Sequence, residues 1–194
     1  MRPSIPTGQW FASRDGGRWW FDSGSVALDF AYTGGFDARW ESLNTPGDLG
    51  AWLTGRFSEV AGEPSDRDLT DAKSLRLTFA RMALAASRGE DPAPGDVDVI
   101  NLFAATPDIP PALPGGSRQA GRSTARTGQA MSAMTRDWVE IFSADASERI
   151  RLCADPTCGL VFYDESRSNN RRWCSMQRCG NRAKVRAHRS RAAG

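Results

Sequence analysis

The sequence predicts a mainly α-helical N-terminal domain with a small β-hairpin, followed by a small C-terminal domain built around cysteines. Apolar residues recur at helical spacing through residues 1–147, glycine- and proline-rich segments separate them, and all four cysteines lie within residues 153–179. We therefore predict two domains, 1–147 and 148–194. With 194 residues, of which 40% are hydrophobic and 25% charged, the chain can bury a core.

The N-terminal domain opens with a predicted hairpin, in which the aromatic residues 10–11 and 19–21 flank a turn at 14–17. Residues 26–31 fit a short buried helix, and a strand stays an alternative because the segment is so short. Thr45 and Pro46 then resemble an N-cap followed by proline at the first helical position.

The clearest helix is expected over residues 65–88. Ser65 and Asp68 have the spacing of a capping box, and apolar residues from Leu69 to Ala86 recur every three or four positions. A shorter helix over 96–105 is expected to bury Val99, Ile100, Leu102 and Phe103.

Four prolines and four glycines within residues 106–128 predict a long loop before a last helix of this domain near 129–146. One face of that helix carries methionine and aromatic side chains. We interpret this face as core packing in preference to a ligand pocket.

The cysteines form two local pairs, with the spacing Cys153-x4-Cys158-x15-Cys174-x4-Cys179. Two such pairs separated by a longer insert are typical of a closed, structural Zn²⁺ site with four thiolate ligands. Disulfides, an iron site or an oxidisable thiol site remain the alternatives. We expect a treble-clef-like zinc finger: a knuckle containing Gly159, a hairpin of 160–163 with 171–173, and a helix over 175–193 whose first turn holds Cys179.

Charge is distributed unevenly along the chain. Residues 151–194 carry a net charge of +7, whereas residues 1–150 carry −5. A cationic end on an acidic domain predicts a polyanionic partner, and nucleic acid is the favoured one. The candidate nucleic-acid-binding residues are Arg167, Arg171, Arg172, Arg178, Arg182, Lys184, Arg186 and Arg189.

Within the predicted last helix, the arginines at 178, 182, 186 and 189 form one stripe. Met176, Cys179, Ala183 and Ala187 form a second, apolar stripe that is expected to face the metal centre, leaving the arginines outward. Asn181 and Arg182 are alternatively expected to turn inward and bond backbone carbonyls near the zinc. His188 is expected to be exposed and not a ligand.

The segment Trp173-Cys174-Ser175-Met176-x-x-Cys179-Gly180-Asn181-Arg182-x-Lys184 resembles the CGNR zinc-finger family, as do Cys153-x4-Cys158-Gly159 and residues 162–164. Residues 26–33 resemble the ABATE domain that commonly precedes this finger. The chain departs from that family at Tyr32, where Asn is usual. The resemblance implies a bacterial, stress-induced transcription regulator whose finger contacts DNA, and the preference for DNA over RNA rests on it alone.

Neither an enzyme nor a membrane protein is expected. The sequence lacks Gly-x-Ser-x-Gly and phosphate-loop motifs, and its one histidine lies in the basic end. The longest apolar run, 82–86, is far shorter than the roughly 20 residues of a membrane span. The N-terminus has no apolar segment like that of a signal peptide, so a cytoplasmic protein is expected.

Two further hypotheses remain open. The finger could be a purely structural module that binds an acidic protein partner, or the acidic domain of a second copy in a homodimer. Alternatively, the helical domain could sense a small molecule, with Asp29 lining a pocket, although a capping or core-bonded role is the commoner one for such an aspartate.

Overall fold

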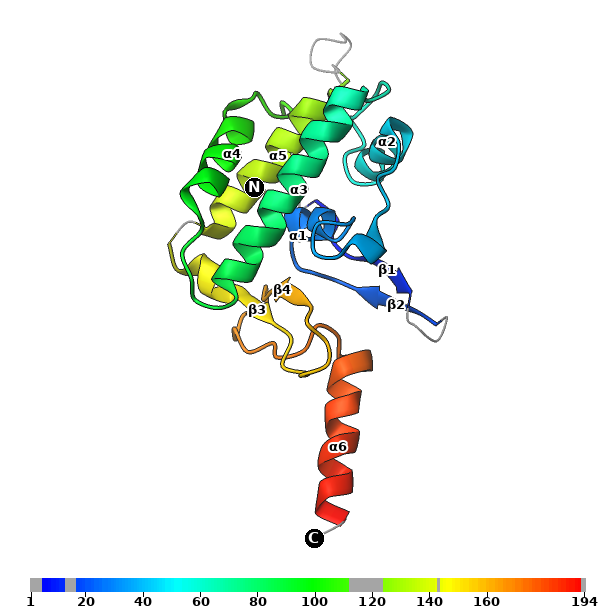
Figure 1. Cartoon of the computed structure of the whole chain (residues 1–194), viewed down its shortest axis with the longest axis vertical. Helices are drawn as coiled ribbons and strands as arrows, with labels where there is room; N and C mark the ends of the chain where they lie inside the picture. The colour runs from blue at the N-terminus through cyan, green and yellow to red at the C-terminus, as the bar shows by residue number, and fades with distance from the viewer. Residues whose placement is uncertain (1–4, 13–16, 112–123, 143, 193–194) are drawn as a thin grey trace.

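The computed structural model describes residues 5–12, 17–111, 124–142 and 144–192 (Figure 1). The predicted turn at 14–17 and much of the 106–128 loop lie outside these residues. The helices and strands, in chain order, are β1 Gln9–Ala12, β2 Arg18–Phe21, α1 Val26–Ala31, η1 Ala38–Trp40, α2 Pro46–Thr54, α3 Asp66–Ala86, α4 Pro94–Ala105, α5 Thr127–Phe142, η2 Ala144–Arg149, β3 Ile150–Leu152, β4 Val161–Tyr163, η3 Met176–Gly180 and α6 Asn181–Ala192. The mainly helical fold with small hairpins is confirmed.

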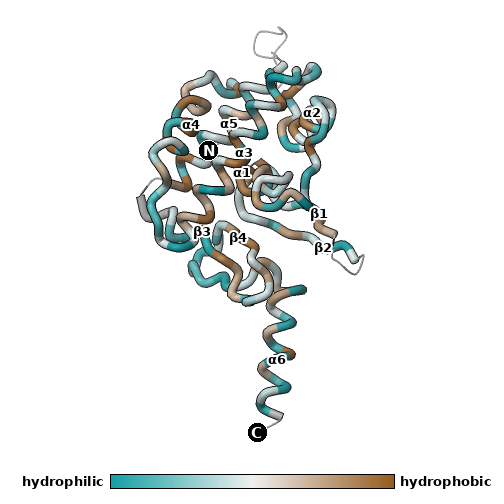
Figure 2. Tube along the Cα trace, viewed as in Figure 1, coloured by the Kyte–Doolittle hydropathy of each residue, from teal (hydrophilic) through white to brown (hydrophobic). Residues whose placement is uncertain are grey.

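The long helix α3 lies at the centre of the N-terminal domain. It begins at the predicted capping box, in which the Ser65 hydroxyl accepts from the Asp68 N–H and the Asp68 carboxylate accepts from the Ser65 N–H. The helices α1, α4 and α5 pack against it (Figure 1). Figure 2 shows hydrophobic segments gathered where α1, α3 and α5 meet.

The apolar faces of α1 and α5 fill the main core. Residues 26–31 form the short helix α1 and not a strand, and every residue of this helix is buried, as predicted. Trp138 of α5 is fully buried, and its ring meets Phe79 of α3 edge-on at 5.3 Å between centroids. Met131 and Met134 are also buried, so this face of α5 is core packing as predicted.

One apolar residue of α4 was placed wrongly from the sequence. Ile100 is buried and Phe103 packs partly on the core, but Leu102 is 71% exposed. Leu102 follows Ile100 by two positions, which puts it on the opposite side of an α-helix. Among the helices of the described segments, none is long and apolar enough to cross a membrane.

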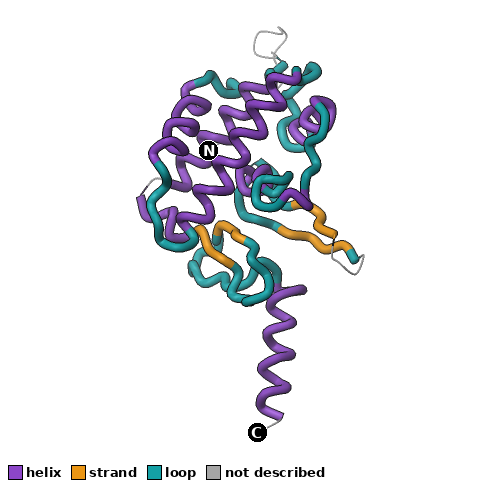
Figure 3. The backbone as a smooth tube through the Cα atoms, viewed as in Figure 1, coloured by secondary structure: helices purple, strands orange, loops and turns teal. Residues whose placement is uncertain are grey.

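Two antiparallel hairpins, β1–β2 and β3–β4, lie on the side of the helices from which α6 extends (Figure 3). Phe11 and Phe21 of the first hairpin form a second apolar cluster together with Tyr32 and three of the cysteines. The strands of the second hairpin join the main core through Ile150 and Val161. The C-terminal segment therefore shares both apolar clusters with the helical domain.

The second hairpin differs from the predicted one. The partner of β4 is β3, which precedes Cys153, and residues 171–173 form no strand. Both edges of β4 are already occupied: β3 lies along one edge, while the Tyr32 hydroxyl and the Ser23 carbonyl bond backbone groups of Val161 and Tyr163 on the other. A strand at 171–173 would therefore find no free edge on β4, and the Arg172 carbonyl instead accepts from the Ala154 N–H, two residues after β3.

Candidate metal centre and cationic surface

The four cysteines meet at one point, although they come from two separate turns. Each contributes one sulfur, and the four sulfurs lie within 4.8 Å of one another. The Cys158 and Cys174 sulfurs are 3.5 Å apart and those of Cys174 and Cys179 are 3.4 Å apart. These separations are far longer than the 2.05 Å bond of a disulfide. The four thiols are free, so these cysteines are not paired as disulfides.

The first pair sits in the turn between β3 and β4. The Cys153 N–H donates to the Leu160 carbonyl at 2.8 Å, and the Cys158 N–H donates to the Asp155 carbonyl at 2.9 Å. Gly159 follows with φ +72°, in the left-handed region that the sequence predicted for a glycine at this turn. The hairpin thus directs two sulfurs to the same side.

The second pair begins in the loop before η3. The Cys174 N–H donates to the Cys153 sulfur at 3.4 Å, which ties the two halves of the site together. Cys179 lies in the wide helical turn Met176–Gly180, where the Gly180 N–H reaches back five residues to the Ser175 carbonyl. This turn leads directly into α6, which begins at Asn181, so Cys179 lies just before the terminal α-helix and not in its first turn as predicted.

The site fits one Zn²⁺ ion. Tetrahedral zinc with bonds of about 2.3 Å to sulfur needs sulfurs roughly 3.8 Å apart, close to the observed separations. Four thiolates complete the coordination shell and leave no position for a reacting water, so the role of the ion is structural. Cys153, Cys174 and Cys179 are buried, and Cys158 is half-buried.

Arg182 and Arg186 connect α6 to the first cysteine turn. Arg182 donates to the Cys179 sulfur at 3.1 Å, and its Nε lies 3.4 Å from the Asp155 carboxylate. Arg186 donates to the same carboxylate at 3.2 Å. The hydrogen bond to Cys179 raises the pKa of Arg182 further above its usual value. A guanidinium here offsets part of the negative charge of the thiolates and the buried carboxylate.

The predicted outward orientation of the arginine stripe is therefore wrong for its two middle members, Arg182 and Arg186. Arg182 and Arg186 turn toward the metal centre, because the sulfurs and buried Asp155 need cationic partners. The apolar stripe does not face the centre throughout, because Met176 is 53% exposed and Ala187 is exposed as well. The Asn181 side chain donates to the Gln177 backbone carbonyl, in the turn that holds Cys179, as the alternative expected, whereas Arg182 donates to a sulfur and not to a carbonyl.

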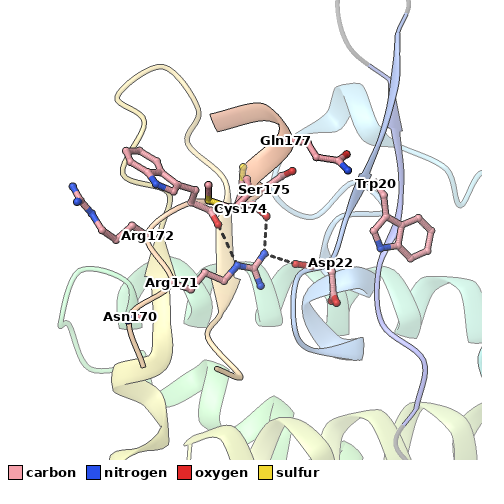
Figure 4. Close-up of a pocket in the computed structure, with 10 residues that line it drawn as sticks. Trp20, Asp22, Asn170, Arg171, Arg172, Cys174, Ser175 and Gln177 are labelled. Carbon is pink, nitrogen blue, oxygen red and sulfur yellow. Dashed lines mark hydrogen bonds between the residues drawn. The ribbon is translucent and has the colours of Figure 1, made fainter. Parts of the chain in front are cut away.

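Arg171 is bound within the protein. Its guanidinium donates to the carbonyls of Trp173, Asp22 and Cys174 at 3.1, 2.7 and 2.6 Å (Figure 4). It also lies over the Phe162 ring at 4.3 Å. Burial lowers the pKa of Arg171 below its usual value. These contacts join the finger to Asp22, the residue after β2, so Arg171 is mainly a structural residue.

The remaining predicted cations are accessible. Arg172 stacks on Trp173 at 5.2 Å, and the half-buried Arg178 stacks on Trp19 of the N-terminal hairpin at 4.5 Å. The exposed set comprises Arg167, Arg172, Lys184 and Arg189, with Arg191 and His188 beside them on α6. The sequence has no Asp or Glu after Glu165, so no carboxylate side chain of the finger's second half neutralises these charges.

Asp29 lies in the core with no exposed surface. Its carboxylate accepts from the Gly8 N–H at 2.5 Å and from the Ser23 hydroxyl at 2.6 Å, with Arg56 at 3.8 Å. Burial raises the pKa of Asp29 to about 6, although the Ser23 bond and Arg56 oppose the shift. The structure thus places Asp29 in the core-bonded role and not on a pocket wall.

Two residues that hold the metal centre and its neighbouring segments in place were not predicted from the sequence. Asp155 lies between the first two cysteines and carries the arginine contacts, and an acidic residue inside a cysteine turn was the available signal. Tyr32 was noted only as a departure from a family pattern. Its buried hydroxyl donates to the Val161 carbonyl at 2.9 Å and accepts from the Val161 N–H at 2.7 Å. No local sequence pattern predicts that long-range contact.

A helical domain joined to a four-cysteine centre and a cationic helix defines a zinc-finger protein. Comparison with protein families agrees: residues 149–192 match the CGNR zinc finger, and residues 24–145 match the ABATE family, described as "Putative stress-induced transcription regulator". The second match covers more than half of the chain, which therefore belongs to the ABATE family and carries a C-terminal CGNR zinc finger. Comparison with curated proteins gives no match.

Proposed function

We propose that this protein is a zinc-dependent, DNA-binding transcription regulator that acts in a stress response and has no catalytic activity. In this proposal the finger contacts the nucleic acid through α6 and its neighbouring arginines, and the N-terminal domain senses the signal or forms a dimer. The family description supports the regulatory role. The charge and placement of α6 support the contact with nucleic acid.

The observation that carries the proposal is the position of α6. This helix packs chiefly on the Met176–Gly180 turn and extends away from the rest of the molecule (Figure 1). Hydrophilic residues occur along its length (Figure 2), and its exposed cations face no carboxylate from its own element. A helix is about 10–12 Å across with its side chains, which matches the major groove of DNA, roughly 12 Å wide, and the 12 residues of α6 provide about 18 Å of length along it.

The zinc centre would serve this contact by fixing the start of the helix. Cys179 anchors the turn that leads into α6, while Arg182 and Arg186 hold the helix against Asp155. Their side chains are still 43% and 50% exposed, so each has surface left for a phosphate. The primary phosphate contacts in the proposal are the freely exposed Lys184, Arg189 and Arg191, supported by Arg167 and Arg172.

A salt series on duplex DNA tests this proposal. If about five phosphates are neutralised, log affinity should fall against log salt with a slope of roughly −4.5. Replacing Lys184, Arg189 and Arg191 together with alanine should reduce the slope to roughly −2 and weaken binding at every salt concentration. Fluorescence anisotropy with a labelled duplex measures both quantities.

The matched control removes three exposed arginines from the N-terminal domain, with Arg67, Arg88 and Arg126 changed to alanine. This control has the same net charge as the α6 variant and should retain the slope of the unmodified protein. Equal slopes for the unmodified protein and the α6 variant would reject the role of α6. A dimer that dissociates as the salt concentration rises and does not bind DNA would instead favour the protein-interaction hypothesis.

A further inference from the structure

A groove of about 660 Å³ lies between the N-terminal hairpin and the finger (Figure 4). The hairpin side contributes Trp20 and Asp22, and the finger side contributes the segment from Asn170 to Gln177. Figure 4 shows Arg171 in the middle, with Trp20 and Gln177 on one side and Arg172 on the other. Its volume lies within the roughly 300–1,000 Å³ range of small-molecule pockets.

Trp20 forms a fixed aromatic wall of this groove. The indole is 44% exposed, yet it packs against Gly8, where a β-carbon would lie only 2.4 Å from the ring. Trp10 meets Trp20 edge-on at 5.5 Å from the paired strand. An exposed indole that is held from behind in this way offers a flat, preorganised surface to a planar ligand.

The opposite wall combines apolar and cationic groups. Trp173 is half-buried, Met176 is 53% exposed, and the guanidinium of Arg172 lies over the Trp173 ring at 5.2 Å. Arg171 places a second positive charge in the floor, fixed by its three bonds to backbone carbonyls. The Asp22 carboxylate accepts from the Gly24 N–H and is the acidic group that lines the groove.

This combination of side chains is suited to a nucleotide. Indole surfaces stack on bases of any sequence, and arginines beside them neutralise the flanking phosphates. A carboxylate can accept from the amino group of a base. A purely apolar partner would leave the exposed charge of Arg172 without a complementary group.

We infer that the groove binds an unpaired base of a nucleic-acid strand, with the base stacked on Trp20 and the strand continuing across the groove so that its phosphates reach Arg172 on the other side. This inference rests on the proposed function, and it adds that the protein prefers single-stranded segments to intact duplex. Bases inside a duplex are stacked on one another and cannot reach an indole that lines a groove. The α6 cations contact the phosphate backbone of both single-stranded and duplex nucleic acid.

The test compares a labelled 12-nucleotide single strand with its duplex at one salt concentration, using zinc-loaded, full-length protein. The unmodified protein should bind the single strand at least about tenfold more tightly, because each stacked base adds about this factor or more. Trp20→Ala should lose about tenfold for the single strand and change duplex affinity less than about twofold. Trp20→Phe should keep most of the single-strand affinity.

Leu102→Ala is the control, because it shortens an exposed apolar side chain far from the groove and should alter neither affinity. Zinc content and circular dichroism confirm that each variant is folded. If Trp20→Ala fails to fold, Arg172→Gln replaces it and should also weaken the single strand more than the duplex. Competition by millimolar mononucleotide distinguishes a strand from a free nucleotide as the ligand.

The outcomes separate this inference from the proposed function. The α6 variant could lose duplex binding while Trp20→Ala leaves the single-strand affinity unchanged. This result would reject the groove as a binding site for a base and leave the regulator proposal intact. If a mononucleotide displaces the labelled strand and binds as tightly as the strand does, the ligand of the groove is a free nucleotide. That result would overturn the stated preference for single-stranded segments. Absence of binding to either form would reject both.

Discussion

Asp155 shows how one buried carboxylate organises the finger. Burial opposes its ionisation, but hydrogen bonds from Thr157 and Arg186, together with the charge of Arg182, hold the pKa of Asp155 below its usual range. The carboxylate therefore stays charged at neutral pH and fixes two arginines that extend from α6. A side chain between two zinc ligands thus determines how the helix leaves the metal centre.

Asp29 presents the opposite case, a carboxyl group whose burial favours the protonated form. We expect an NMR titration of its carboxyl carbon to give a pKa near 6, compared with 3.8 for an unperturbed aspartate. Because the folded pKa is the higher one, the contribution of Asp29 to stability is complete below about pH 4. It is lost as the pH rises through about 6, so the free energy of unfolding should decrease over this window.

Two comparisons test the cause of this shift. Arg56→Met removes the nearby positive charge and should raise the pKa of Asp29 further. Asp48 provides an internal comparison for the effect of burial. This carboxylate is exposed, and hydrogen bonds from the backbone and side chain of Thr45 and from Asn44 lower its pKa, so it should titrate at a lower pH than Asp29. A titration of Asp29 near pH 4, as for an exposed aspartate, would contradict the core-bonded role.

At the scale of elements, we expect the finger to depend on zinc more than on packing. We expect a chelator to abolish hydrogen-exchange protection at the Cys153 and Cys174 amides, whose partners lie in the metal turns. Structural zinc contributes roughly 10–16 kcal/mol to folding such modules, more than so few residues gain from a core. Amides in the middle of α3 should remain protected longer.

Mass spectrometry of bound metal gives the corresponding mutational test. Cys174→Ser should eliminate stoichiometric zinc, whereas Ser168→Ala, an exposed change in the same loop, should retain one ion per chain. Retention of one tightly bound zinc by the Cys174 variant would show that the four sulfurs do not act as one site.

The elements also show where sequence reasoning succeeds. The bounds of α3 were predicted to within two residues, because a capping box and a regular apolar period both mark them. The four zinc ligands were predictable because their spacing alone implies convergence. The strand partner of β4 was not, because three-residue strands carry no periodicity and their pairing depends on which edge is free.

At the scale of the whole molecule, the two family segments are joined through Tyr32. Its hydroxyl satisfies both backbone groups of Val161, which lies 129 residues later in the chain. Such a link could not be read from the sequence, because neither residue stands in a local motif. The predicted boundary at 147 and 148 stays a prediction, but β3 and β4 clearly contribute to the core of the helical domain.

Tyr32→Phe should therefore destabilise the entire protein. The change leaves a buried N–H and a buried carbonyl without a partner, which costs about 1–3 kcal/mol. Urea unfolding of the zinc-loaded protein should show this loss in one transition that includes both segments. Tyr163→Phe is the matched control, because that half-buried tyrosine should change stability by less than about 0.5 kcal/mol. Equal effects of both changes would contradict the role of the Tyr32 link.

Because α6 is attached at one end only, small rotations near Cys179 become large movements at its tip. A helix of 12 residues is about 18 Å long, so a tilt of about 10° at the pivot displaces the last turn by about 3 Å. The same two arginine–carboxylate contacts that hold the pivot also set its stiffness. The angle at which the tip meets a curved partner is thus governed by the side chains around a single carboxylate.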